Sequence, residues 1–432
     1  MIKGPFLTDL DSRGRVKGSR DPLGLQPIWT RFGRHVVGNL STVTNSVRDF
    51  TVLLLGYFFA ERVMQSHPGS SPLEIFLKWE QLAGYARAEF NKDHSFRGTE
   101  RVHKNLAEGD RITISASPAH QILGDQKNYG LWGLYTVPSR ASGLLEGEQP
   151  RLSPPAHEFV ENVYLPIMKR EGFSGGDKIT GMLTAPESRI DIRGKANQLA
   201  AGVAKLLSLR VLQQERVFYR FHLLHGGPQD STGGQQQQLA GMIESTINDR
   251  EFSWSQPSIV SLAKTASKLG FEPLSGRLSR IATCESLIAP ISDLFRYLLG
   301  CDGKTDAEIA GRIRETWGAH VRVIRPEAIH EILAELAIGS EDTKGRWLDI
   351  SMAMTQGDYK KLVGLLLDQN RDVMSTRGGS PWIEKKGNRL NVRFKDEWGS
   401  LPDASEIGTL WRFSYFLPSL RDIALQLREG GR

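Results

Sequence analysis

One apolar run limits the possible folds of this chain more than any other feature of its sequence. The run is FTVLLLGYFFA, residues 50–60, and charged residues flank it on both sides. As a helix it would cover only about half of the ~30 Å hydrocarbon core of a bilayer. We therefore expect a helix that is buried in a protein core, within a helical stripe over residues 46–64. The sequence predicts no membrane span.

Length and composition are typical of a folded protein with more than one core. The chain has 432 residues, of which 39% are hydrophobic and 24% are charged, and such a length suits two or three domains. The N-terminal sequence MIKGPFLTDLDSRGRVKG contains no apolar stretch of signal-peptide length, so we expect a cytoplasmic protein. Cys284 and Cys301 lie outside any CxxC motif, and reduced thiols are expected rather than a disulfide or zinc site.

The basic residues gather in two segments of the chain. A formal net charge of +6 permits a polyanionic partner without requiring one, so the distribution of charge is more informative than the total. The residues are Arg13, Arg15, Lys17, Arg20, Arg31 and Arg34 near the N-terminus, and Lys385, Lys386, Arg389, Arg393 and Lys395 near the C-terminus. If the protein binds nucleic acid, we expect these side chains to contact it.

Glycine, proline and glutamine mark the expected division into domains. Residues 1–35 show no sustained periodicity, so we expect an extended basic arm. The polar stretch HGGPQDSTGGQQQQ cannot build a core, and residues 226–238 are expected to form a linker or exposed loop. It would separate a mainly helical N-terminal domain, residues 36–225, from a helical C-terminal domain, residues 239–432. The expected fold class is mainly α with small β-hairpins, and the C-terminal domain would end in a basic hairpin and two helices divided by Pro418.

Residues 117–168 follow the order of elements of a winged helix-turn-helix. Two short helices, the second ending at SGLL, would precede a short hairpin and a third helix. Residues 137–141 would then be the recognition helix, with Ser139 and Arg140 exposed at its start. The wing, however, carries two glutamates that would repel a phosphate backbone. Three alternatives remain open: core packing in a helical domain, a winged helix that contacts protein, and DNA reading.

The best-defined local feature is a basic hairpin at residues 382–394. Two strands would surround the turn-forming sequence KKGN. Alternation along the second strand places Leu390, Val392 and Phe394 on one face and the basic side chains opposite them. A basic face of this kind suits nucleic-acid binding, although a solvated structural hairpin would have the same pattern.

The same region contains a pattern that resembles the metal site of restriction-type nucleases. Asp372 is followed, further along the chain, by Glu384 and Lys386 as a Glu-x-Lys sequence. In such enzymes the carboxylates hold Mg²⁺ and the lysine stabilises or activates the attacking water. Here Asp372 falls toward the end of an expected helix and Lys386 in an expected turn, which disfavours a rigid site. A divergent Mg²⁺-dependent nuclease is therefore the alternative, and otherwise we expect no cofactor.

Three stretches resemble sequences of uncharacterised bacterial proteins encoded in phage-defence or DNA-modification loci. They are DPLGLQPIW, GLWGLYTVPSRASGLL and GGSPWIEKKGNRLNVRF. The resemblance implies a companion subunit that works with an ATPase, a nuclease or a modifying enzyme. We therefore expect a non-enzymatic subunit of an anti-phage defence assembly that binds other proteins and nucleic acid, with DNA favoured, and no membrane. The alternatives are the nuclease and a winged-helix transcriptional regulator.

Overall fold

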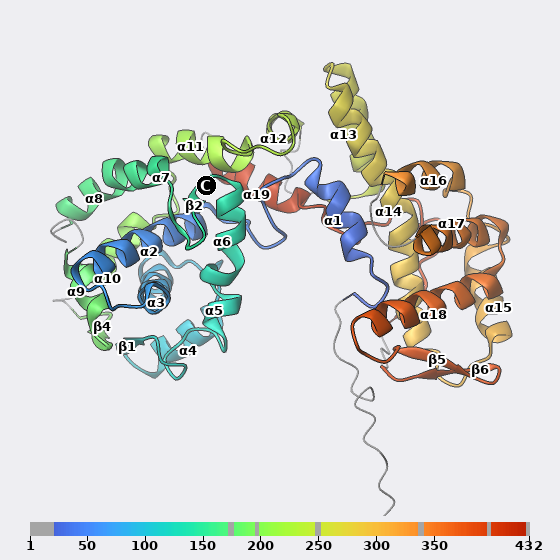
Figure 1. The fold of residues 1–432 in the computed structure, drawn as a ribbon, viewed down its shortest axis with the longest axis horizontal. Coiled ribbons are helices and arrows are strands. Elements are labelled where there is room, and N and C mark those ends of the chain that lie inside the picture. Colours follow the sequence, from blue (N-terminus) through green and yellow to red (C-terminus); the bar gives the residue numbers. More distant parts are fainter. Residues whose placement is uncertain are drawn as a thin grey trace, which may run out of the picture. The chain divides into compact units, whose positions relative to one another are not determined.

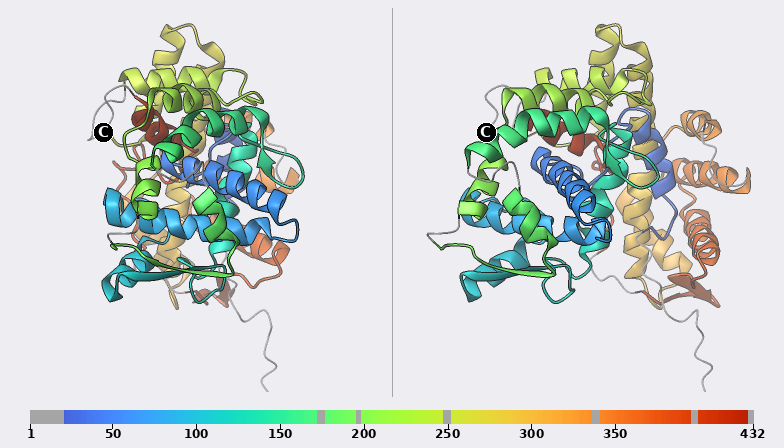
Figure 2. Two further views of the ribbon diagram at one scale, coloured as in Figure 1. Left: turned by 90° about the vertical axis from the view of Figure 1, so that its left-hand side faces the viewer. Right: turned by 60° about the vertical axis from the view of Figure 1, so that its left-hand side comes forward.

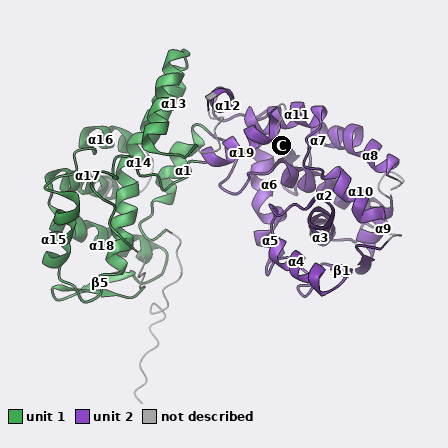
Figure 3. Ribbon diagram, turned by 180° about the vertical axis from the view of Figure 1, so that it is seen from behind, with its two compact units in different colours: residues 1–36, 249–415 green, residues 37–248, 416–432 purple. Residues whose placement is uncertain are grey.

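The chain folds into helices joined by loops and small antiparallel hairpins (Figure 1), and two further views show the same helical character (Figure 2). The structure is a computed structural model that describes residues 21–171, 177–194, 198–246, 252–335, 341–394 and 399–428. Two compact units divide the chain. Unit 1 comprises Met1–Val36 and Asp249–Tyr415, and unit 2 comprises Val37–Asn248 and Phe416–Arg432 (Figure 3). The predicted mainly α fold class is confirmed.

The division into units differs from the one expected at residues 226–238. The chain passes from unit 1 to unit 2 after Val36, returns to unit 1 at Asp249, and ends in unit 2 with helix α19 (Leu417–Leu427). The expected boundary therefore lies inside unit 2. Composition does not reveal the first crossing, because Val36 and Val37 are both buried and no polar linker marks it.

The glycine- and glutamine-rich stretch predicted as a linker is packed into unit 2. The carboxylate of Asp230 accepts the backbone N–H of Thr232 at 2.8 Å in a turn, and helix α12 (Gln235–Thr246) follows. The side chain of Gln236 is buried and donates to Asn39 Oδ1 at 2.7 Å. Residues 226–234 form a loop with several exposed positions, whereas the expectation that Gln235 and Gln236 are solvated was wrong, because a glutamine amide can replace water as the partner of other buried polar groups.

The second part of the predicted extended arm is a helix of unit 1. Helix α1 (Gln26–Arg34) begins near Asp21, whose carboxylate accepts the backbone N–H of Leu25 at 2.7 Å. Its apolar side is buried, and the ring of Trp29 stacks on that of Phe413 with centroids 6.1 Å apart. Two helical turns are too short for their periodicity to stand out in the sequence. The predicted binding residues Arg13, Arg15, Lys17 and Arg20 lie outside the described residues.

Unit 1 is built around the long helix α14 (Glu272–Leu299), which packs against α13 (Gln256–Lys268), α16 (Pro326–Ala334) and α1. The other elements are α15 (Asp306–Trp317), α17 (Glu341–Gln356), α18 (Tyr359–Thr376), β5 (Ile383–Lys386) and β6 (Arg389–Val392). Thr305 and Glu308 form a capping box at the start of α15, as their spacing predicts.

The segment that precedes α19 is not the first of the two predicted C-terminal helices. Residues 404–409 form turns and residues 410–414 form no regular structure. The buried carboxylate of Glu285, on α14, binds this segment: it accepts the backbone N–H groups of Arg412 and Phe413, the latter at 3.2 Å, and the hydroxyl of Tyr415 at 2.7 Å. Backbone donors that bind a carboxylate are not available for a helical hydrogen-bond ladder, which explains the difference.

Burial of Glu285 should make the stability of the protein depend on pH. Burial raises the pKa of this carboxyl from 4.5 to about 7, although Arg412 and Tyr415 oppose the shift. Below the pKa that Glu285 has in the unfolded state, the protonated carboxyl makes its full contribution to stability. This contribution is lost as the pH rises through the pKa of the folded state. We expect Glu285 to lower the free energy of unfolding by about 3 kcal/mol across this window.

Urea-induced unfolding of the Glu285→Gln variant at about pH 5 and about pH 8 measures this effect. The variant should lack the part of the pH dependence that Glu285 contributes, because glutamine does not titrate. Glu315→Gln, at an exposed position of α15, is the matched control and should behave like the wild type. Equal pH dependence in the wild type and in Glu285→Gln would contradict the prediction.

Unit 2 is organised around helices α2 (Val47–Ser66) and α3 (Pro72–Asn91), which pack against each other. Every residue of the apolar run 50–60 is buried in α2, so the predicted buried helix is confirmed. Among the described residues, the helices are all too short or too polar to span a bilayer.

The remaining helical elements before α12 are α4 (Thr99–Glu108), α5 (Gln126–Tyr129), α6 (Leu131–Ala141), α7 (Pro154–Phe159), α8 (Leu165–Arg170), α9 (Asp177–Thr184), α10 (Gln198–Leu206) and α11 (Gln213–Tyr219), with the π-helical turns η2 (Val160–Tyr164) and η4 (Arg220–Leu224). Strand β1 (Arg111–Ser115) pairs with β4 (Glu187–Asp191), and β2 (Leu145–Glu146) with β3 (Arg151–Leu152).

Residues 117–168 contain the expected order of helices and hairpin, but not the expected recognition helix. Helix α6 runs through Pro138 rather than beginning at it. Ser139 is 0% exposed, and Arg140 donates to the backbone oxygens of Gly147 and Glu148 at 2.8 and 2.6 Å. The exposure predicted for Ser139 was wrong, because this side chain packs in the core, whereas Arg140 is half-buried and braces the tip of the β2–β3 hairpin. The geometry therefore favours core packing for this segment.

Candidate nucleic-acid interface

The basic hairpin predicted at residues 382–394 forms in unit 1. Strand β5 pairs antiparallel with β6, and Lys386 lies opposite Arg389 at the turn. Lys386 thus belongs to a strand rather than to the predicted turn. Leu390 and Val392 are buried as expected, whereas Phe394 is 40% exposed and does not complete their face. Alternation therefore holds within the paired strands and ends where the pairing ends.

A third segment extends the hairpin along the edge of β6. The backbone N–H of Gly303 donates to Leu390 O, and the N–H of Leu390 donates to Lys304 O, both at 2.9 Å. Thr305 forms an isolated bridge with Arg389. Gly303, Lys304 and Thr305 belong to the sequence GCDGKT, which follows helix α14 and precedes α15. Lys304 is exposed beside the hairpin, and it was not among the site residues predicted from the sequence.

Two of the predicted binding cations pair with carboxylates. Lys385 Nζ lies 2.7 Å from Asp306 Oδ2, and Arg393 Nη2 lies 2.8 Å from Glu384 Oε2. Such pairing reduces the positive charge that these two side chains offer to a phosphate group. The basic character predicted for the whole face is therefore concentrated in fewer residues.

Three exposed cations remain at the turn end of the hairpin, and we call Lys304, Lys386 and Arg389 the cationic edge. Arg389 donates to Gly303 O at 2.7 Å rather than to a carboxylate, and Lys386 has no ion-pair partner in the described part of the chain. The nearby carboxylate of Glu308 caps α15, and hydrogen bonds from Thr305 lower its pKa, with Arg389 and Lys304 adding to the effect. Most of the cationic edge thus remains open to an anionic ligand.

The carboxylates of the nuclease alternative lie in ion pairs. Asp372 lies on α18, and its carboxylate pairs with Arg346 at 2.6 Å and Arg371 at 3.3 Å. Glu384 pairs with Arg393. Over the described ranges, no three His, Cys, Asp or Glu side chains come together as metal ligands would. Each of the two carboxylates therefore already has an arginine partner.

The other predicted binding cations are not part of the paired strands of the hairpin. Arg31 is exposed on α1, whereas Arg34 is half-buried there and burial lowers its pKa. Neither residue belongs to the cationic edge. Lys395 lies outside the described residues.

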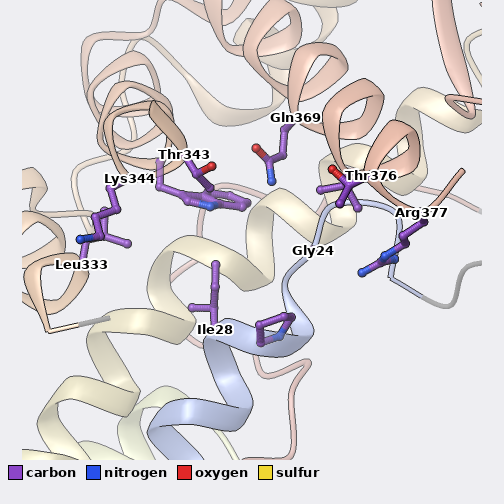
Figure 4. A pocket seen from close by; sticks show the side chains of 11 residues that line it. Gly24, Ile28, Leu333, Thr343, Lys344, Gln369, Thr376 and Arg377 are labelled. Carbon is purple, nitrogen blue, oxygen red and sulfur yellow. The ribbon is translucent and has the colours of Figure 1, made fainter. Parts of the chain in front are cut away.

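A separate pocket of about 280 Å³ lies in unit 1 where the chain before α1 meets α17 and α18 (Figure 4). Two of its polar side chains, Gln369 and Arg377, already hold the backbone of that segment. The side-chain amide of Gln369 donates to Leu23 O at 2.9 Å and accepts from Arg346 at 3.0 Å, and Arg377 donates to Asp21 O. These contacts explain the pocket as part of the packing of the N-terminal segment.

Comparison of the chain with protein-family models, with curated proteins and with solved structures finds no match. The geometry of the cationic edge is therefore the main ground on which a function can be inferred.

Proposed function

We propose that this protein is a non-enzymatic subunit of a bacterial anti-phage defence assembly that binds nucleic acid through the cationic edge. The observation that carries the proposal is the cross-strand pair of Lys386 and Arg389. Like charges that lie directly opposite each other destabilise a hairpin, and here they lie at the exposed turn end with Lys304 on the neighbouring segment. A polyanion would relieve this repulsion.

A phosphate backbone is the polyanion that suits this edge best. Lysine contributes a mobile point charge, and arginine contributes a planar fork of donors that matches phosphate oxygens. Contacts of this kind position a protein on nucleic acid without reading the bases. The role in phage defence, and partners such as an ATPase or a nuclease, rest on the resemblance of three sequence stretches to proteins of such loci.

The double variant Lys386→Glu/Arg389→Glu tests the proposal. Both side chains are exposed, so the fold should be kept while duplex DNA binds less tightly on every sequence. Each lost phosphate contact lowers the slope of log affinity against log salt by about 0.9, so the slope should fall by almost two units. Arg393 stays unchanged because it pairs with Glu384. Titrations at several salt concentrations measure both quantities.

Lys268→Glu/Arg322→Glu is the matched control for this experiment. It changes the net charge by the same amount at two exposed positions of unit 1 that lie on other elements. It should leave the salt slope unchanged. A specific role for the cationic edge would be contradicted if Lys386→Glu/Arg389→Glu had the same salt slope as the wild type. It would also be contradicted if both double variants lost the same affinity for duplex DNA.

A further inference from the structure

A small aromatic pocket in unit 1 lies at the open end of the basic hairpin. The pocket has a volume of about 220 Å³, and four of its lining residues are aromatic: Phe295, Trp382, Phe394 and Phe413. Trp382 directly precedes β5, and Phe394 lies just beyond β6. The same hairpin therefore carries the cationic edge at its turn and this aromatic pocket at its open end.

The indole of Trp382 carries a hydrogen-bond donor that the fold does not use. Trp382 is 7% exposed, and its Nε1 atom is buried without a partner among the residues that the structure describes. Tryptophan N–H groups usually find a partner when they are buried, because an unsatisfied donor is costly. Because this atom has almost no accessible surface, the pocket is lined by other atoms of Trp382.

The rings of the pocket are arranged for stacking. Phe394 stacks on Trp382 with centroids 4.4 Å apart and an interplanar angle of 29°. The ring centroids of Phe295 and Trp382 are 6.5 Å apart. Because Phe394 is 40% exposed, part of its surface can still receive a planar ligand. Aromatic platforms beside basic residues are the usual means of holding unpaired bases.

Size and charge favour a nucleobase over a cation. A cavity of about 150 Å³ is known to accommodate benzene, so this pocket has room for a heterocyclic ring with substituents. Arg296, which lines the pocket, carries a positive charge and does not attract a cationic ligand. The carboxylate of Asp21, which could attract one, is already bound by the backbone of Leu25 and Gln26 and by Arg377.

We propose that the aromatic pocket holds one unpaired base of a nucleic acid whose backbone contacts the cationic edge. This inference rests on the proposed function and makes it more specific, because it assigns a preference for single-stranded or locally unpaired nucleic acid. Trp382 and Lys386 are about 13 Å apart along the strand at ~3.3 Å per residue. A short single strand can span that length.

The test compares a single-stranded oligothymidine with a duplex of the same length by fluorescence anisotropy. Phe394→Leu keeps an apolar side chain but removes the stacking surface, and should weaken single-strand binding by about 5- to 100-fold while duplex affinity stays the same. Trp382→Phe reduces the ring surface that stacks with Phe394 and should act in the same direction. An abasic oligonucleotide should bind the wild type and Phe394→Leu equally.

Phe221→Leu, at an exposed phenylalanine of η4 in unit 2, is the matched control and should leave both affinities unchanged. Thermal unfolding followed by circular dichroism checks that each variant is folded. If Phe394→Leu does not fold, the affinity of Trp382→Phe for the single strand tests the pocket. If the pocket variants bind single strands normally while Lys386→Glu/Arg389→Glu weakens both ligands, the pocket proposal fails and the proposed function stands. If Lys386→Glu/Arg389→Glu changes neither affinity, the proposed function itself fails.

Discussion

Replacing Arg87 with methionine is expected to lower the free energy of unfolding by about 3–5 kcal/mol, the usual cost of removing one partner from a buried ion pair. Arg87 lies on α3 in unit 2 and is almost fully buried. Its Nη1 lies 2.6 Å from Asp49 Oδ1, and its Nε lies 2.8 Å from Asp93 Oδ2. Methionine can fill the space of the arginine stem, but it leaves both carboxylates without a cation. Urea-induced unfolding measures the loss.

The loss should also depend on pH. Burial alone would raise the pKa of Asp93, but Arg87 and hydrogen bonds from Ser95 outweigh it and keep the pKa below its ordinary value. The wild type therefore gains stability from this carboxylate above the unfolded pKa and loses it as the pH falls. Arg87 contributes to the lowered pKa, so its removal takes away part of this stabilisation, and the difference between the two proteins should shrink as the pH falls below the unfolded pKa of 3.8.

Arg189→Met is the matched control for Arg87→Met. Arg189 also pairs with a carboxylate, that of Glu187, but it is 81% exposed. An exposed pair contributes about 0–1 kcal/mol, so this variant should unfold almost like the wild type. Similar losses for the two variants, or a loss from Arg87→Met that does not change with pH, would show that the buried carboxylates do not depend on Arg87.

Features of the fold that depend on neighbouring residues could be predicted from the sequence. The start of α15 follows from Thr305 and Glu308, which satisfy each other's backbone groups within one turn. The buried helix α2 follows from its unbroken apolar run. In contrast, the burial of Gln236 depends on Asn39, which is far away in the sequence. No local pattern identifies that partner, so the burial of this glutamine could not be predicted from the sequence.

The same distinction applies to the candidate site. The alternation of Leu390 and Val392 predicts the hairpin and its buried face. The pairing of Lys385 with Asp306 and the position of Lys304 both depend on the chain between α14 and α15 returning to the edge of β6. The sequence therefore locates the basic hairpin but does not show which cations remain exposed and unpaired. The aromatic pocket depends on the same kind of long-range packing.

Replacing Gly357 with alanine should be the other strongly destabilising change, at roughly 2–5 kcal/mol, because it combines left-handed backbone strain with overpacking. Gly357 lies in the turn between α17 and α18 with φ of +70°, a conformation that residues with a Cβ rarely adopt. A methyl group there would collide with the backbone oxygen of Ala319. That oxygen belongs to the backbone, so it cannot move aside as a side chain would. Thermal and urea-induced unfolding measure the effect.

Gly311→Ala separates this effect from a general response to added methyl groups. Gly311 lies inside helix α15, and no atom of another element lies within 4 Å of the position that its Cβ would take. Alanine stabilises a helix interior relative to glycine by roughly 0.5–1 kcal/mol, so this variant should be more stable than the wild type. Opposite signs for the two substitutions are expected because the same methyl group meets a backbone carbonyl at one position and open space at the other. If Gly357→Ala unfolded like the wild type, the close approach of the α17–α18 turn to Ala319 would be wrong.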